Sequence, residues 1–76
     1  MAMKRKKKRD VEKSYSRQMF VAKLRRLADT LEHGERFVIR VAGETVRVPA
    51  DASVGIEHER GAGMEELEFQ ITWSHR

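Results

Sequence analysis

The feature that most constrains this chain is a run of alternating side chains near its C-terminus. The apolar residues Leu67, Phe69, Ile71 and Trp73 occupy every second position, with acidic or polar residues between them. Because successive side chains of a β-strand point to opposite faces, this run predicts a closing strand with one apolar and one acidic or polar face. We expect a helix to cover the apolar face.

A pattern of helical period lies upstream and supplies that helix. Ser16 suits an N-cap, because its hydroxyl can accept from an amide of the first turn. Gly34 can take the left-handed conformation that ends helices. These signals predict a helix over residues 17–33. Its apolar stripe is formed by Phe20, Leu24, Leu27 and Leu31. Its opposite face carries Arg25, Arg26, Asp29 and Glu32.

After Gly34 the period switches from helical to two, which predicts a hairpin. Its inward face would be formed by Phe37, Ile39, Val41, Val46 and Val48. Pairing Val41 with Val46 leaves a two-residue loop that begins with Gly43, as a type II′ turn requires. The same register places Arg40 opposite Arg47.

The next inward face is Val54, Ile56 and His58, and Gly61-Ala62-Gly63 then turns the chain into the closing strand. The hydrophobic register sets Ile56 opposite Phe69. It also places Glu57 across from Glu68 and Glu59 across from Glu66, although like charges in opposite positions are normally destabilising.

Together these elements predict an α+β domain in the order β-α-β-β-β-β. Residues 10–15 would form a short peripheral first strand, with Val11 and Tyr15 facing inward and the last strand beside it. One helix would pack on a four- to five-stranded, mainly antiparallel sheet as a two-layer sandwich. With 76 residues, the chain has room for one domain with a small core.

Charge divides the chain into an arm and a domain. Six consecutive cations lie near the N-terminus: Lys4, Arg5, Lys6, Lys7, Lys8 and Arg9. We expect residues 1–9 to be a disordered basic arm and residues 10–76 to be the single domain. No apolar stretch follows the arm, so neither a signal peptide nor a membrane span is expected. The chain has no cysteine, which fits a reducing cytoplasm and excludes disulfides and thiolate chemistry.

The helix with its glycine stop, the glycine-turn hairpin and the closing strand that ends at Trp73 together resemble the amphi-Trp domain family. These small bacterial and archaeal proteins are named for an amphipathic last strand that ends in tryptophan. The resemblance covers roughly residues 10–73, and the closing strand is its most specific part. It implies a fold and a role for Trp73. The family has no established activity, so no catalytic residue is implied.

Two features of the predicted domain can bind a partner. Trp73 either covers one end of the core or is a partly exposed anchor, since tryptophan is enriched at interface hot spots. The outer sheet face is either a solvated surface with diagonal pairs, such as Arg47 with Glu57, or a docking surface for a basic partner. The charged residues of that face are Arg40, Arg47, Glu57, Glu59, Glu66 and Glu68.

The arm is a third candidate. Six adjacent cations can neutralise phosphates and bind DNA or RNA without sequence selectivity. The alternatives are a solubilising tail or an electrostatic tether. Tyr15 is the one nearby aromatic residue that could add base stacking.

The sequence offers no set of residues that assembles a reaction. His33, His58 and His75 lie on different predicted elements, so we expect neither a metal site nor a cofactor. We therefore expect a non-enzymatic interaction module that binds a protein partner, as a monomer or as a homodimer joined through open strand edges. Nucleic-acid binding through the arm is the alternative.

Overall fold

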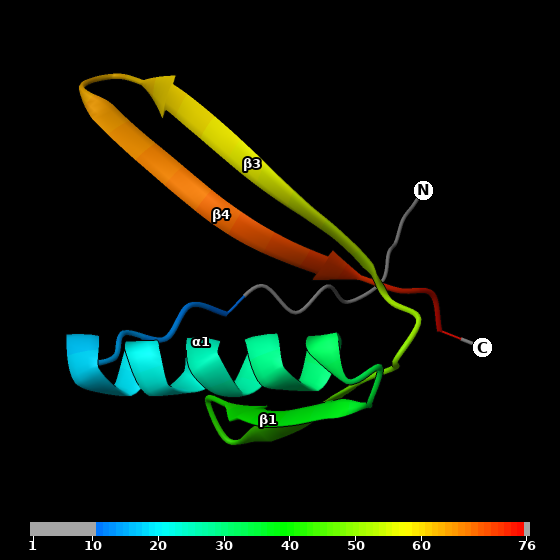
Figure 1. Ribbon diagram of the computed structural model, residues 1–76. Helices are drawn as coiled ribbons and strands as arrows, with labels where there is room; N and C mark the ends of the chain where they lie inside the picture. The colour runs from blue at the N-terminus through cyan, green and yellow to red at the C-terminus, as the bar shows by residue number, and fades with distance from the viewer. Residues whose placement is uncertain (1–10, 76) are drawn as a thin grey trace, which may run out of the picture.

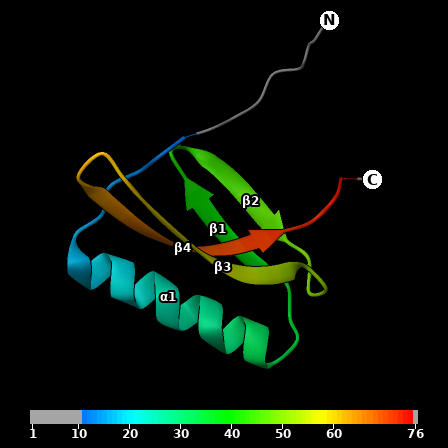
Figure 2. The same cartoon turned by 90° about the horizontal axis from the view of Figure 1, so that it is seen from above.

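The computed structural model describes residues 11–75. One helix is followed by two antiparallel hairpins, each a separate two-stranded sheet. The elements are α1 (Arg17–Glu32), β1 (Phe37–Val41), β2 (Glu44–Val48), β3 (Ser53–Gly61) and β4 (Met64–Thr72). The α+β class is confirmed, but the prediction of one four- to five-stranded sheet is wrong. Figure 1 shows α1 beside β1–β2, with β3–β4 diverging from both toward its free tip, and Figure 2 gives the view from above.

The predicted first strand is not formed by residues 11–15, which have no regular secondary structure. Val11 is exposed, and Tyr15 instead meets the helix, where the Lys23 ammonium lies 5.0 Å from the ring centroid. This contact is a cation–π interaction on the outside of the domain. Asp10 lies outside the described residues.

Both ends of α1 are capped as the sequence predicts. The Ser16 hydroxyl accepts from the Met19 amide at 3.2 Å. At the other end Gly34 has a φ of +67°, in the left-handed region. The Gly34 amide donates to the Leu31 carbonyl and the Glu35 amide donates to the Thr30 carbonyl. This pair of bonds is a Schellman motif, which satisfies carbonyls that the helix itself leaves free.

The core lies where α1 meets β1–β2, and it is small. Within residues 11–75, Phe37 and Val48 are the buried hydrophobic side chains, and they stand opposite each other in the β1–β2 ladder. Arg26 joins the layers, since its guanidinium lies 4.8 Å from the Phe37 ring centroid and donates to the Val38 carbonyl at 3.1 Å. The prediction that Arg26 faces away from the strands is therefore wrong. Its long side chain reaches around the helix to β1.

Both hairpins close with the same two-residue Ala-Gly turn. Ala42 and Gly43 have φ of 49° and 83°, and Ala62 and Gly63 have φ of 51° and 76°. Positive φ at both central positions defines a type I′ turn, whose twist matches that of the strands. In β1–β2 the observed turn is one residue earlier than the type II′ turn that the sequence predicted.

The earlier turn changes the partners across β1–β2. Arg40 stands opposite Thr45, and Arg47 stands opposite Val38, so the predicted Arg40–Arg47 pair is wrong. In β3–β4 the predicted register is confirmed, with Ile56 opposite Phe69 and Glu57 opposite Glu68.

The β3–β4 hairpin is separate from the rest of the fold. No Cα atom of β3 or β4 lies within 8 Å of a Cα atom of α1, β1 or β2. A short turn precedes it, in which the Ala52 amide donates to the Pro49 carbonyl at 3.2 Å. The prediction that β3 and β4 pack their apolar side chains under the helix is wrong in this structure. Ile71, near the base, is the one partly buried residue of the two strands.

Ala42 tests the hairpin turn that sets the β1–β2 register. Replacing Ala42 with Asn should raise the free energy of unfolding by about 0.5–1 kcal/mol, because Asn tolerates the left-handed region better than Ala. Replacing Ala42 with Val should lower it by about 1–2 kcal/mol, because a β-branched residue is strained there. Urea unfolding followed by circular dichroism measures both. A Val variant more stable than the Asn variant would contradict the assigned turn.

Candidate interaction surface

The inner side of β3–β4 is an open apolar surface. Its central residues form two opposed pairs, Val54 with Ile71 and Ile56 with Phe69, and Leu67 follows beside them. The exposed fractions are 66% for Val54, 65% for Ile56, 63% for Leu67 and 65% for Phe69. We call these four exposed residues the apolar face. Toward the tip it ends at a polar pair, in which His58 Nε2 lies 2.7 Å from Glu65 Oε2.

The outer side of the same hairpin is acidic. The strand register sets Glu57 directly opposite Glu68 and Glu59 directly opposite Glu66, as the sequence predicts. We call these four residues the acidic face. The Gln70 amide donates to Glu57 Oε1 at 2.8 Å and to Glu68 Oε1 at 3.3 Å, and so bridges two of the carboxylates.

Crowding of carboxylates perturbs the acidic face. The hydrogen bond and charge of Glu68 raise the pKa of Glu57, and Gln70 opposes this by donating to the ionised form. Charge repulsion from Glu68 is also the largest cause that raises the pKa of Glu66. Both shifts mean that the ionised forms are disfavoured in the folded hairpin. A cation brought to this face would relieve the repulsion.

The helix turns an apolar surface toward the same open side. A hollow of about 460 Å³ is lined by one hairpin residue, Phe69, and otherwise by the helix. The helix residues that line it are Val21, Leu24, Arg25, Leu27, Ala28 and Leu31. Leu24 and Val21 are each 38% exposed, so the predicted apolar stripe is only partly covered by its own chain.

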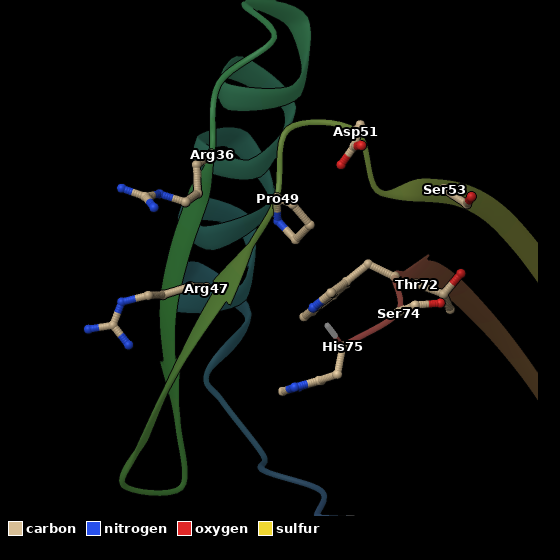
Figure 3. A pocket seen from close by; sticks show the side chains of 9 residues that line it. Arg36, Arg47, Pro49, Asp51, Ser53, Thr72, Ser74 and His75 are labelled. Carbon is tan, nitrogen blue, oxygen red and sulfur yellow. The ribbon is translucent and has the colours of Figure 1, made fainter.

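Trp73 lies at the base of the two hairpins rather than on the open hairpin. It is 37% exposed and helps to line a cleft of about 660 Å³, together with Pro49, Arg36 and Arg47. In Figure 3 the guanidinium groups of Arg36 and Arg47 extend away from Ser74 and His75 across the cleft. The cleft therefore does not gather its cationic groups around one point. Trp73 stays a predicted partner-binding residue.

The charged residues predicted to share one sheet face are divided between two sheets. Arg40 lies on β1, where it donates to the Thr45 hydroxyl at 3.2 Å and to the Gly43 carbonyl at 2.9 Å. Arg47 lies on β2, and within residues 11–75 it forms no ion pair with Glu57. Only the four glutamates are brought together. The predicted arm residues 4–9 lie outside the described part of the chain.

Sequence reasoning missed the four residues of the apolar face as candidates, because it assigned them to the core. One feature of the sequence argued against a hairpin that is simply part of the core. Two pairs of glutamates stand opposite each other on the outer side of this hairpin, an arrangement that a strand pair does not favour without a further partner.

Between residues 11 and 75, no group of three or more His, Asp or Glu side chains is placed to hold a metal ion. In that same stretch, no helix has the length and apolar character needed to cross a membrane.

The fold and its exposed hairpin define a small α+β domain in which a capped helix packs on one hairpin and a second, amphipathic hairpin stands free. The family model of the Amphi-Trp domain matches residues 3–76, so the chain belongs to this family. The match includes part of the arm and the C-terminal tail, and is longer than the resemblance seen in the sequence. No curated protein and no solved structure matches the chain.

Glu68 provides a test of the acidic face. Glu57 and Glu66 should titrate above 4.5, their ordinary value, and Glu68→Gln should lower both pKa values toward it. Because the folded-state pKa values are raised, they favour the hairpin at acid pH, and this contribution is lost as pH rises from about 4.5 through them. Carboxyl carbon chemical shifts measure the titrations. The control is Glu65→Gln, on the other side of β4, which should move neither; equal titrations in wild type and Glu68→Gln would refute the coupling.

Proposed function

We propose that this chain is a non-enzymatic binding module that engages polypeptide partners through the β3–β4 hairpin. The observation that carries the proposal is the apolar face, whose four side chains are 63% to 66% exposed. Contiguous apolar patches of this kind mark interaction sites, since each Å² removed from water contributes about 25 cal/mol. The cysteine-free sequence supports a cytoplasmic setting for this binding.

The two faces of the hairpin suit different parts of a partner. An apolar layer would cover Ile56 and Phe69, and would complete the two-layer packing that the amphipathic pattern calls for. Basic side chains of the partner would approach the acidic face, where they relieve the repulsion between Glu57 and Glu68. Arg40 and Arg47 lie on the other hairpin and Trp73 lies at the base of β4, so any contact they make would be at the rim.

A matched pair of variants tests the binding role. Phe69→Lys adds a cation to the apolar face and removes its largest side chain, and should weaken partner capture about thirtyfold, as for an interface hot spot. Val38→Lys adds the same charge to the exposed side of β1, where Val38 is 41% exposed and lies away from both faces of β3–β4, and should retain capture. Immobilised variants are compared for the amount of each protein captured from extracts of the source cells, with partners identified by mass spectrometry. Equal capture by the two variants would contradict the proposal, and so would turnover of a captured ligand.

The second candidate function is nucleic-acid association through the arm. The observation that favours it is the run of six cations at residues 4–9, which is long enough to neutralise several phosphates. This function requires no contact with the hairpin, so it can be separated from the first by truncation.

Deleting residues 1–9 should abolish binding to a labelled duplex. If six phosphates are neutralised, the affinity of the full chain should fall about a thousandfold between 50 and 200 mM salt, because counterion release sets the slope. Fluorescence anisotropy measures both chains. A variant with Gln at all six arm positions keeps the length and should match the truncated chain. Salt-independent binding, or equal affinity with and without the arm, would exclude this candidate.

A further inference from the structure

We propose that the apolar face of β3–β4 docks on the helix of a second copy of this chain, in a reciprocal two-fold dimer. The inference rests on the proposed function, that the hairpin binds polypeptide, and it names the partner. In the dimer each chain contributes its hairpin to the other chain's helix and receives the other hairpin on its own.

The first argument is that one chain carries both halves of an apolar interface and leaves both uncovered. The hairpin half is the apolar face. The helix half is the side of α1 that lines the 460 Å³ hollow, and it continues to Phe20, which is 54% exposed. A surface of this kind is self-complementary, and two-fold symmetry lets both halves be buried at once.

The second argument is that the chain does not close this interface on itself. No Cα atom of the hairpin lies within 8 Å of a Cα atom of α1, and Phe69 is the single hairpin residue that lines the hollow. Figure 1 shows that the separation grows toward the hairpin tip. The two apolar halves of one chain therefore do not cover each other along most of the hairpin.

The third argument is size. Seven large apolar side chains on the hairpin and on this side of the helix are each at least 38% exposed: Phe20, Val21, Leu24, Val54, Ile56, Leu67 and Phe69. A side chain of this kind removes about 60–120 Å² from water when it is fully buried. Because about half of each remains exposed, together they offer about 230–470 Å² of apolar area per copy, which is comparable with the apolar share of a standard interface of about 800 Å² per partner.

The fourth argument is charge. Helix α1 carries four cationic side chains against two carboxylates: Arg17, Lys23, Arg25, Arg26, Asp29 and Glu32. Hairpin β3–β4 has the opposite balance, with five glutamates against the single Arg60. Arg25 itself lines the hollow beside Phe69, and Glu65 is the hairpin carboxylate on the apolar side, so a second hairpin would bring Glu65 to the same side as this cation. Like-charged helices or like-charged hairpins would repel, so the charges favour helix against hairpin.

Sedimentation equilibrium of the full chain tests the dimer. The wild type should sediment at twice the 8.9 kDa chain mass at micromolar concentration. Phe69→Lys should shift the dissociation constant upward at least tenfold, and Val38→Lys, on the exposed side of β1, should leave the dimer intact. A monomeric wild type overturns the proposal, as does a Phe69→Lys variant that dimerises as tightly as wild type.

Isotope-filtered NMR on a mixture of labelled and unlabelled wild-type chains decides the case where a variant does not fold. Contacts between chains should join Leu67 and Phe69 of one copy to Leu24 and Ala28 of the other. A dimer whose contacts between chains lie elsewhere overturns the proposal, and so does a hairpin that contacts only its own helix. A monomer that still loses its captured partners in Phe69→Lys would remove the dimer and leave the proposed binding function standing.

Discussion

The structure depends on the contact between α1 and β1, and Arg26 is at its centre. Its guanidinium lies over the Phe37 ring and also donates to the Val38 carbonyl, so one side chain links the helix to both the packing and the backbone of the strand. Phe37 and Val48, opposite each other in the ladder, are the buried hydrophobic side chains of the described region. A core of this size holds the helix against one hairpin. It does not extend to the second hairpin, whose apolar face stays exposed.

The sequence predicted the helix and both hairpins well because their signals are local. The Ser16 cap and the Gly34 stop act within one turn of the helix, and both are confirmed. The register of β1–β2 was harder to predict, because Ala42-Gly43 and Gly43-Glu44 are both acceptable two-residue turns. The two registers differ by two residues, which keeps every side chain on the same face. The apolar pattern is identical in both, so it could not decide whether Arg40 opposes Arg47 or Thr45.

The position of β3–β4 could not be predicted from its pattern, for a different physical reason. Alternation shows that Leu67 and Phe69 share a face, but it does not identify the layer that covers that face. A helix of the same chain, a helix of another copy and a different protein all satisfy it equally. The segment from Pro49 to Ala52, which joins the two hairpins, carries no periodic signal from which its path could be predicted. The helical pattern likewise placed Arg26 on the outer side, although its long side chain reaches β1.

The same alternation that leaves an apolar face open also crowds the opposite side with carboxylates. Both conditions are unfavourable for a hairpin alone in water, and the proposed partner would relieve them by different means. Covering Ile56 and Phe69 removes apolar surface and involves no proton. A cation that approaches Glu57 and Glu66 lowers their raised pKa values, so its binding releases protons and strengthens as pH rises through those values. The pH dependence of association therefore separates the two faces: an interface built on the apolar face alone is insensitive to mild acid, whereas one that also uses the acidic face weakens there.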